Sequence, residues 1–285
     1  MDVTYIRPKN TRDALAELAK WGEKRRILAG GTDLLVRMEQ GVEEPEVIID
    51  ISAVDEWKHI QRRDGKIKIG SLVTYRDIEE DGNGLTNDAC VLVEACRQIG
   101  SVQIRNRATI GGNLGNASPA ADAVLALYVL DAEICLESVK GERWIPVSKF
   151  IIGPGKTVRK LDEVITAVAF SPMKDGERGF FQKIGQRRAV TISKVSAGGT
   201  VLMEGKTIKQ CRLALGAVAP TVLRVQEVEA MLTGQPLDSD HITRAAAIAM
   251  QTCTPIDDIR STVSYRRKLA GVLVRRGLES CQFSQ

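Results

Sequence analysis

Two glycine-rich stretches decide how this chain folds: LAGGTDL at residues 28–34 and TIGGNLGNASPAAD at residues 109–122. The first follows a short apolar stretch that we expect to form a strand, and a predicted helix follows it. Glycine lets a backbone approach an anion closely, and N–H groups at the start of a helix attract phosphate. Together, Gly30-Gly31-Thr32 and Gly111-Gly112-Asn113 could hold one pyrophosphate through backbone donors. Taken alone, each glycine pair is better explained as a tight turn.

The common nucleotide-binding fingerprints are not supported. The GPGKT sequence at residues 153–157 ends like a Walker loop, but Phe150 stands where that motif needs glycine. Pro154 also removes a backbone donor from this segment. The GGNLG sequence at residues 111–115 has Ile110 where the Rossmann fingerprint has its first glycine. Any nucleotide bound here is therefore held by a different arrangement.

The composition of the 285-residue chain is that of a globular protein with 44% hydrophobic and 27% charged residues. At about 150 residues per domain, the length predicts two domains. No apolar run approaches the ~20 residues of a membrane-spanning helix. The N-terminal residues lack the apolar core of a signal peptide, and the six cysteines contain no CxxC pair. We therefore expect a cytoplasmic protein with reduced cysteines that pack as small hydrophobic residues.

Scarce residue types limit the chemistry that the chain can perform by itself. It has two histidines, 4% aromatic residues and a net charge of +4, the difference between 40 basic and 36 acidic residues. This composition disfavours histidine-based catalysis, a zinc site and a stacking surface for nucleic acid. Dispersed doublets such as Arg25-Arg26 and Arg187-Arg188 are interpreted as solvated surface or subunit contacts. A bound cofactor would supply the chemistry of an enzyme with this composition.

Hydrophobic periodicity predicts a mixed succession of helices and strands. Residues 1–52 form a β-α-β-like unit, and a hairpin turns at Asp64-Gly65. A helix is expected from Asn87, as its N-cap, to Ile99, and another begins at Pro119. A polar break at residues 171–176 marks a domain boundary. Beyond it, three strands and then three helices are predicted at residues 178–184, 195–203, 211–218, 224–232, 238–252 and 263–279.

The two glycine stretches resemble the FAD-binding signatures of the flavoprotein (medium) subunits of molybdenum hydroxylases. This family includes bacterial xanthine, nicotinate and carbon monoxide dehydrogenases. The resemblance is colinear over nearly the whole chain. It also covers Gln103–Asn106, Gly153–Thr157, Leu215–Pro220 and Ser264–Leu269.

The resemblance implies an α+β fold. Residues 1–172 would form a two-lobed FAD-binding domain of the vanillyl-alcohol-oxidase type, with lobes at about 1–55 and 56–172. Residues 176–285 would form a C-terminal domain with a three-stranded antiparallel sheet and a helical bundle.

The resemblance also assigns residues to FAD, and none to catalysis or to a metal. The assigned residues are Leu28, Ala29, Gly30, Gly31, Thr32, Asp33, Leu34, Ile99, Thr109, Ile110, Gly111, Gly112, Asn113, Asp122, Ile165 and Lys183. Alternatives stay open for three of them: a first-turn helix acid for Asp122, a core residue for Ile165 and a solvated strand lysine for Lys183. Ile99 stands where animal relatives stack an aromatic ring, so aliphatic packing against the flavin is implied.

The function implied by the resemblance is electron transfer. FAD would take electrons from two [2Fe-2S] clusters on a small partner subunit and pass them to NAD⁺ or another acceptor. A large partner subunit with a molybdenum cofactor would hydroxylate a purine or related N-heterocycle, in a dimer of heterotrimers. Thr32-Asp33 replaces the His-Ser of the carbon monoxide branch, which favours the xanthine and nicotinate branches. The alternative is a cofactor-free assembly subunit of such a complex.

Overall fold

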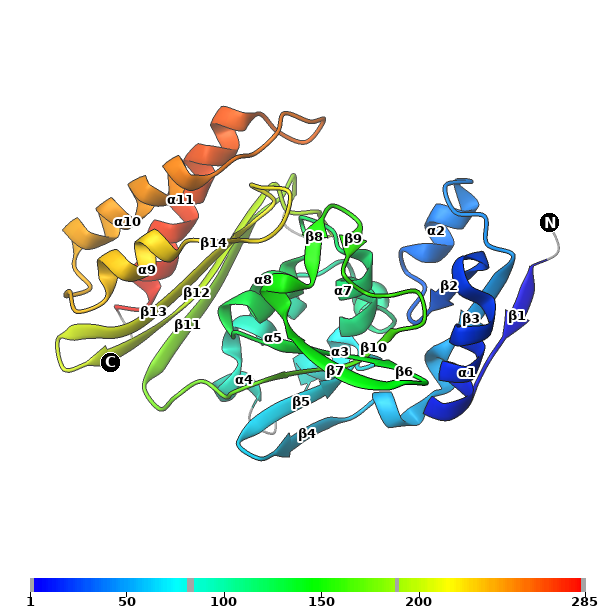
Figure 1. Cartoon of the computed structure of the whole chain (residues 1–285). Coiled ribbons are helices and arrows are strands. Elements are labelled where there is room, and N and C mark those ends of the chain that lie inside the picture. The colour runs from blue at the N-terminus through cyan, green and yellow to red at the C-terminus, as the bar shows by residue number, and fades with distance from the viewer. Residues whose placement is uncertain (1–2, 81–84, 188–189, 283–285) are drawn as a thin grey trace. The chain divides into compact units, whose positions relative to one another are not determined.

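The computed structural model describes residues 3–80, 85–187 and 190–282. These residues belong to two compact units, each built from segments that are separate in the sequence. The first unit draws on residues 1–78, 102–117 and 132–171. The second draws on residues 79–101, 118–131 and 172–285. Helices and strands occur in both units, which confirms the predicted α+β class (Figure 1).

The first unit begins with a three-stranded parallel sheet in the order β1-β3-β2. Its strands are β1 (Thr4–Ile6), β2 (Arg25–Leu28) and β3 (Val47–Asp50). Every residue of the central strand β3 is buried, as expected of a parallel strand that is covered on both faces. The connecting helix α1 (Thr11–Trp21) starts at Asn10, whose side chain accepts a hydrogen bond of 2.9 Å from Asp13 N. The predicted β-α-β-like unit is thereby confirmed.

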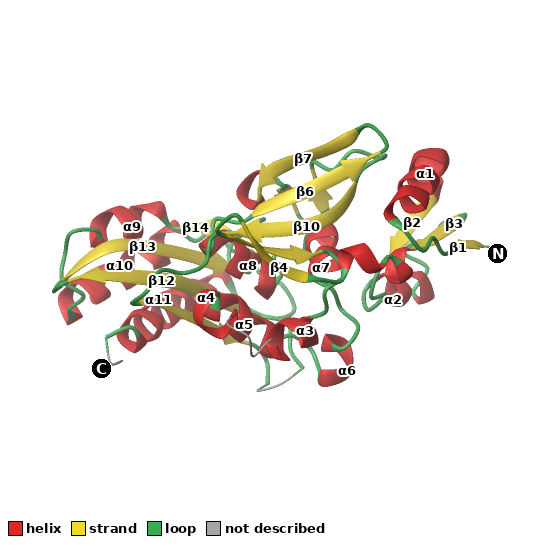
Figure 2. Ribbon diagram, turned by 90° about the horizontal axis from the view of Figure 1, so that it is seen from below, coloured by secondary structure: helices red, strands yellow, loops and turns green. Residues whose placement is uncertain are grey.

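A five-stranded antiparallel sheet in the order β4-β5-β10-β6-β7 completes the framework of the first unit (Figure 2). Its strands are β4 (Ile60–Arg63), β5 (Lys66–Gly70), β6 (Glu133–Ser138), β7 (Gly141–Pro146) and β10 (Val164–Phe170). Asp64 and Gly65 both have positive φ between β4 and β5, as a type I′ turn requires. The hairpin predicted at Asp64-Gly65 is therefore confirmed.

Shorter elements connect these sheets. They are α2 (Leu34–Glu39), α6 (Val102–Arg105), α7 (Ile110–Asn116), β8 (Ile151–Gly153), β9 (Lys156–Thr157), and the 3-10 helices at Gly22–Lys24, Ile51–Ala53, Asp55–Trp57 and Val147–Lys149. Helix α3 (Tyr75–Glu80) crosses the change of unit after residue 78. Strands β8 and β9 pair as a hairpin with Gly155 at φ +67°. The segment Gly153–Thr157 thus continues into a strand and not into the helix that a Walker loop needs.

The second unit is built on an antiparallel sheet in the order β11-β12-β13-β14. The long strands are β11 (Glu177–Ile184), β12 (Val195–Glu204) and β13 (Thr207–Gly216). The first two match their predicted ranges to within one residue, and β13 begins four residues before its predicted start at residue 211. The two-residue strand β14 (Leu223–Arg224) adds a fourth member, which is too short to leave a periodic pattern. Helices α9 (Gln226–Leu232), α10 (Ser239–Thr252) and α11 (Val263–Ser280) cover one face of this sheet (Figure 1).

Helices also cover the other face of this sheet. Side chains alternate between the faces of a strand, and Ala197 of β12 lies in the core beneath α9–α11. The next residue, Gly198, faces Leu125 of α8 (Asp122–Val129). Helix α5 (Cys90–Arg97) packs against both α8 and β11. Two starting points were predicted wrongly: Ala89 precedes α5 after the separate short helix α4 (Leu85–Asp88), and α8 begins three residues after Pro119.

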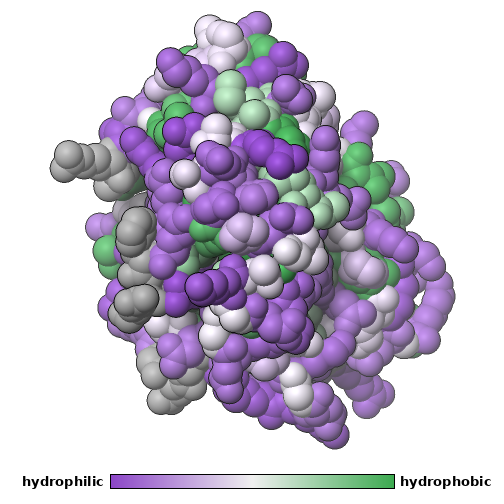
Figure 3. All heavy atoms as spheres, turned by 90° about the vertical axis from the view of Figure 1, so that its left-hand side faces the viewer, coloured by the Kyte–Doolittle hydropathy of each residue, from purple (hydrophilic) through white to green (hydrophobic). Residues whose placement is uncertain are grey.

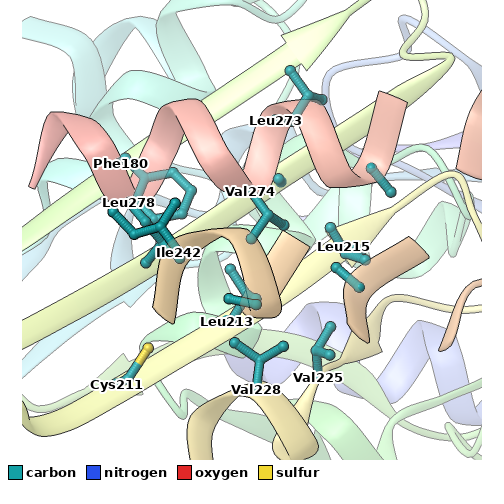
Figure 4. Close-up of a cluster of buried hydrophobic side chains, with 14 of the residues drawn as sticks. Phe180, Cys211, Leu213, Leu215, Val225, Val228, Ile242, Leu273, Val274 and Leu278 are labelled. Atoms are coloured by element: carbon teal, nitrogen blue, oxygen red, sulfur yellow. The ribbon is translucent and has the colours of Figure 1, made fainter. Parts of the chain in front are cut away.

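The core of the second unit lies between the sheet and helices α9–α11 (Figure 4). Phe180 of β11 packs there with Leu273, Val274 and Leu278 of α11. Gly277 of α11 makes room for the Phe180 ring, because a Cβ at this position would lie 2.1 Å from a ring carbon. This close packing fixes α11 on the sheet.

The described residues contain no helix that is long and apolar enough to cross a membrane. On the face drawn in Figure 3, hydrophilic residues predominate and hydrophobic residues are scattered among them.

We predict that Gly277→Ala destabilises the second unit by about 1–3 kcal/mol, because the new methyl group overlaps a buried ring. Gly271→Ala on the same helix is the matched control. A Cβ there would lie 2.7 Å from Cγ and Sδ of Met250, whose side chain can shift, and 3.1 Å from the Ala246 carbonyl oxygen, so we expect a smaller loss of stability. Chemical denaturation of both variants measures the difference, and equal free energies of unfolding would contradict the packing account.

Candidate cofactor-binding site

The first glycine stretch connects β2 to α2. Its backbone packs directly against the backbone of Arg107 and Ala108. Gly31 has φ +77°, a left-handed conformation that favours glycine. A Cβ on Gly30 would lie 1.9 Å from the carbonyl oxygen of Arg107 and 3.0 Å from Cα of Ala108. Only glycine permits this contact. The structure therefore joins the first stretch directly to the residues that precede the second.

The first stretch presents unpaired backbone donors. Among the described residues, none accepts a hydrogen bond from the N–H groups of Gly30, Gly31, Thr32 or Asp33. Asp33 is the N-cap of α2, but its side chain forms no capping hydrogen bond. Gly30, Gly31 and Thr32 are partly exposed, and Asp33 is exposed. Consecutive free N–H groups of this kind can bind an anion, as the sequence predicts for this loop.

The second stretch is the first turn of a helix and its donors are occupied. Ile110 N–H donates to Val73 O at 3.1 Å, and Gly111 N–H donates to Ser71 O at 2.9 Å. The Thr109 side chain caps α7 by accepting from Gly112 N–H at 3.1 Å, and its carbonyl accepts from Asn113 N–H at 3.0 Å. The expectation that this stretch offers backbone donors is therefore wrong. Residues about 40 positions earlier in the sequence already satisfy two of them.

The second stretch instead offers a bare surface and one side chain. Gly112 and Gly115 are exposed three residues apart, so they lie on the same side of α7. A Cβ on Gly112 would point towards Ala29, with 4.0 Å between the two Cβ atoms. Asn113 Oδ1 is buried and has no hydrogen-bond partner in the structure. Since an amide can turn over, the same position can present either an acceptor or a donor.

These features fit a diphosphate group such as that of FAD. The first stretch has free N–H groups, and the exposed glycines of α7, beside Ala29, would let a ligand approach that helix closely. The buried Asn113 oxygen would gain a partner that none of the described residues provides. Sequence reasoning missed Gly115, although its spacing from Gly112 was visible, because that glycine was examined only against the Rossmann fingerprint.

The remaining assigned residues of the first unit lie around these loops. Ile165 on β10 is buried, and its Cδ1 lies 3.9 Å from the position of a Cβ on Gly115. It therefore packs beside the bare side of α7, which suits both the core alternative and a residue at the edge of a cofactor site. Leu28 and Leu34 are partly buried at the end of β2 and the start of α2.

In the second unit, Asp122 and Lys183 form a buried ion pair of 2.8 Å between Nζ and Oδ2. Lys183 Nζ also donates to Gln98 O at 2.7 Å, and the Ser193 hydroxyl donates to Asp122 Oδ1 at 2.7 Å. Burial raises the pKa of the Asp122 carboxyl, and the ion pair with Lys183 opposes that rise. Both carboxylate oxygens of Asp122 are thus occupied.

The contacts of Asp122 and Lys183 rule out the solvated-lysine alternative for Lys183. They also involve Ser193 and Gln98, which the sequence did not indicate. Lys183 is not a solvated strand lysine, because only 6% of its side chain is exposed. Its bond to Gln98 O satisfies a carbonyl at the end of α5, directly before the partly buried Ile99. Ser193 and Gln98 have no local sequence signal, since their partners lie far away in the chain.

Two further predictions concern cysteine and arginine. All six cysteines are free, and burial raises the pKa of Cys211 to about 12 and that of Cys253 to about 11. These buried thiols pack as small hydrophobic residues, as expected.

The prediction that Arg25 lies on the surface is wrong. Arg25 is buried, and its guanidinium donates to the carbonyl oxygens of Leu18 and Leu161. Burial lowers the pKa of Arg25 to about 10. Arg188 lies outside the described residues.

Two family models of known proteins match the chain. Residues 1–172 match the FAD binding domain in molybdopterin dehydrogenase, and residues 180–281 match the CO dehydrogenase flavoprotein C-terminal domain. The chain belongs to the family of FAD-binding medium subunits of molybdenum hydroxylases. It is therefore a flavoprotein subunit of an oxidoreductase, as the sequence predicts.

Individual relatives cover nearly the whole chain. The carbon monoxide dehydrogenase medium chain of Hydrogenophaga pseudoflava is 30% identical over 97% of this chain and 96% of the relative. The nicotinate dehydrogenase FAD-subunit of Eubacterium barkeri is 31% identical over 94% of this chain and 92% of the relative. A solved structure of the Hydrogenophaga pseudoflava carbon monoxide dehydrogenase, in a form lacking the Mo-pyranopterin moiety of its cofactor, matches with a TM-score of 0.95 and 28% identity. That match covers 99% of this chain and 98% of the other.

We predict that Gly112→Leu weakens FAD binding by at least about tenfold, because the leucine covers the exposed glycine surface of α7. The stability of the apoprotein is measured in parallel, because the new Cβ would lie 3.0 Å from the Thr109 hydroxyl that caps α7. Gly30 and Gly31 are less suitable for this test, since substitution there disturbs the backbone itself. Gly153→Ala, in open space in the same unit, is the control. Undiminished FAD binding by Gly112→Leu would contradict the site.

Proposed function

We propose that this subunit relays electrons from a partner's [2Fe-2S] clusters through FAD to NAD⁺ or another acceptor. When bound, FAD can take up two electrons and release them as a hydride or singly. The chain's own residues hold the cofactor and shield it, and no protein general base is assigned. This proposal rests on membership of the flavoprotein family and on the glycine-lined site of the first unit.

The observation that carries the proposal is the unequal use of backbone donors in the two glycine stretches. N–H groups at Gly30–Asp33 are free among the described residues, whereas those at Ile110–Asn113 are bonded within the chain. We propose that the first stretch binds the FAD diphosphate through its backbone. Helix α7 then contributes the bare surface at Gly112 and the Asn113 side chain.

The wider assembly is proposed from the family. A large subunit with a molybdenum cofactor and a small subunit with two [2Fe-2S] clusters would complete a cytoplasmic dimer of heterotrimers. Residues 1–172 would act as the FAD-binding domain and residues 176–285 as the C-terminal domain. Asp122, Lys183, Ile99 and Ile165 are proposed as further FAD-binding residues, with aliphatic packing where animal relatives have a ring.

The substrate is proposed to be a purine or related N-heterocycle. Thr32-Asp33 supports this choice, because the carbon monoxide branch has His-Ser at these positions. Overall sequence identity does not distinguish the carbon monoxide branch from the nicotinate branch of the family. The relatives named for these two substrates are 30% and 31% identical to this chain. The alternative of a cofactor-free assembly subunit is disfavoured by the intact glycine pairs and the unpaired Asn113 oxygen.

We predict that the purified full chain carries close to one FAD per molecule. Visible flavin absorption before denaturation and free FAD after it measure the occupancy. If the assembled complex releases no FAD, the assembly-subunit alternative replaces the electron-transfer proposal.

The acceptor is tested on the complete complex under anaerobic conditions. After reduction by a purine, we expect NAD⁺ to restore the oxidised flavin spectrum and to yield NADH in equal amount. If the flavin stays reduced with NAD⁺ but is reoxidised by a quinone or ferredoxin, NAD⁺ is not the acceptor. The proposed electron-transfer role would then still hold.

A further inference from the structure

Two segments that the sequence singled out, Leu215–Pro220 and Ser264–Leu269, meet at the buried residue Arg266. Only 6% of the Arg266 side chain is exposed, although it lies on the long helix α11. Its guanidinium donates to Ala217 O at 3.0 Å and to Asp258 Oδ1 at 2.6 Å. A buried charge persists only when it is paired in this way. Arg266 is therefore committed to contacts within the second unit.

Asp258 is itself held in place by the connection between α10 and α11. The same carboxylate oxygen accepts hydrogen bonds from Arg260 N–H at 2.8 Å and Ser261 N–H at 3.1 Å. These two backbone hydrogen bonds orient the Asp258 carboxylate independently of its bond to the Arg266 guanidinium. This arrangement sets the position of the Arg266 donor that reaches Ala217.

Ala217 has an unusual backbone conformation that needs support from its surroundings. Its φ is +59°, in the left-handed region that residues other than glycine rarely adopt. Its carbonyl accepts from Arg266, and its N–H donates to Pro119 O at 2.9 Å. A strained conformation of this kind is kept only when the neighbouring contacts enforce it. Arg266 and Pro119 supply those contacts.

Pro119 lies in the turn that leads into α8. Ala121 N–H donates to Ser118 O at 3.1 Å, which closes the turn, and the next residue is Asp122. Asp122 then bonds to Lys183 and Ser193, as described above. A continuous set of contacts therefore runs from Asp258 through Arg266, Ala217 and Pro119 to the start of α8.

We propose that Arg266 is a positioning residue for FAD binding. It holds Ala217 in the left-handed conformation, and Ala217 N–H in turn fixes the Pro119 carbonyl and the entry to Asp122. Arg266 acts through these residues, because its side chain is buried and its guanidinium bonds to Ala217 O and Asp258 within the chain. The inference rests on the proposed function in one respect, the assignment of Asp122 to the FAD site.

The test measures FAD binding by the full chain and its variants, with the thermal stability of the apoprotein recorded in parallel. We expect Arg266→Met to weaken FAD binding by about tenfold and to alter the visible circular dichroism of bound flavin. Arg276→Met is the matched control, because it removes the same charge from an exposed position of the same helix. It should leave both properties unchanged. Arg266→Lys keeps the charge with fewer donors and should fall between the wild type and Arg266→Met.

A double-mutant cycle with Ala217→Gly tests whether Arg266 affects FAD binding through the backbone conformation of Ala217. Glycine adopts the left-handed conformation without strain, so Arg266→Met should weaken FAD binding less in that background. Additive losses would overturn the proposal, as would wild-type FAD binding by Arg266→Met. Unfolding of both Arg266 variants would assign a purely structural role and also overturn it. Failure of the wild-type chain to bind FAD would instead refute the proposed function.

Discussion

The backbone contact between Gly30 and Arg107–Ala108 is the constraint on which the cofactor-binding site of this subunit depends. A single added carbon at Gly30 would overlap the Arg107 carbonyl, so the two stretches can meet only where one residue lacks a side chain. The contact joins the β2–α2 connection to the residues that begin α7. Each stretch contains one glycine that a close approach within the chain requires: Gly30 beside the Arg107 carbonyl and Gly111 beside Ser71.

The two glycine stretches, which the Gly30 contact brings together, have different roles. Helix α7 is fixed by hydrogen bonds to Ser71 and Val73 and by its Thr109 cap, so its first turn is rigid before any ligand binds. The first stretch keeps its N–H groups free among the described residues, and we propose that these groups attract the diphosphate. A helix surface without side chains, close to residues with free N–H donors, suits a ligand that is held by its diphosphate. It also explains how a chain with a net charge of only +4 can hold an anionic cofactor.

Local features of the fold could be predicted from the sequence, and long-range pairings could not. The hairpin at Asp64-Gly65 and the strands and helices after residue 176 follow from turn residues and periodicity within short windows. The occupied donors of α7 depend on Ser71 and Val73, and the burial of Lys183 depends on Gln98 and Asp122. Arg25 was misplaced for the same reason, because its acceptors include the distant Leu161 carbonyl. No spacing rule within the sequence reports such contacts.

The central claim is that FAD is held by the backbone of Gly30–Asp33 and not by that of Ile110–Asn113. Hydrogen–deuterium exchange of the individual backbone amides, with and without FAD, tests it most directly. The account predicts that FAD slows exchange at Gly30, Gly31, Thr32 and Asp33, while the amides of residues 110–113 are protected in both states. Unchanged exchange at residues 30–33 together with new protection at residues 110–113 would contradict it.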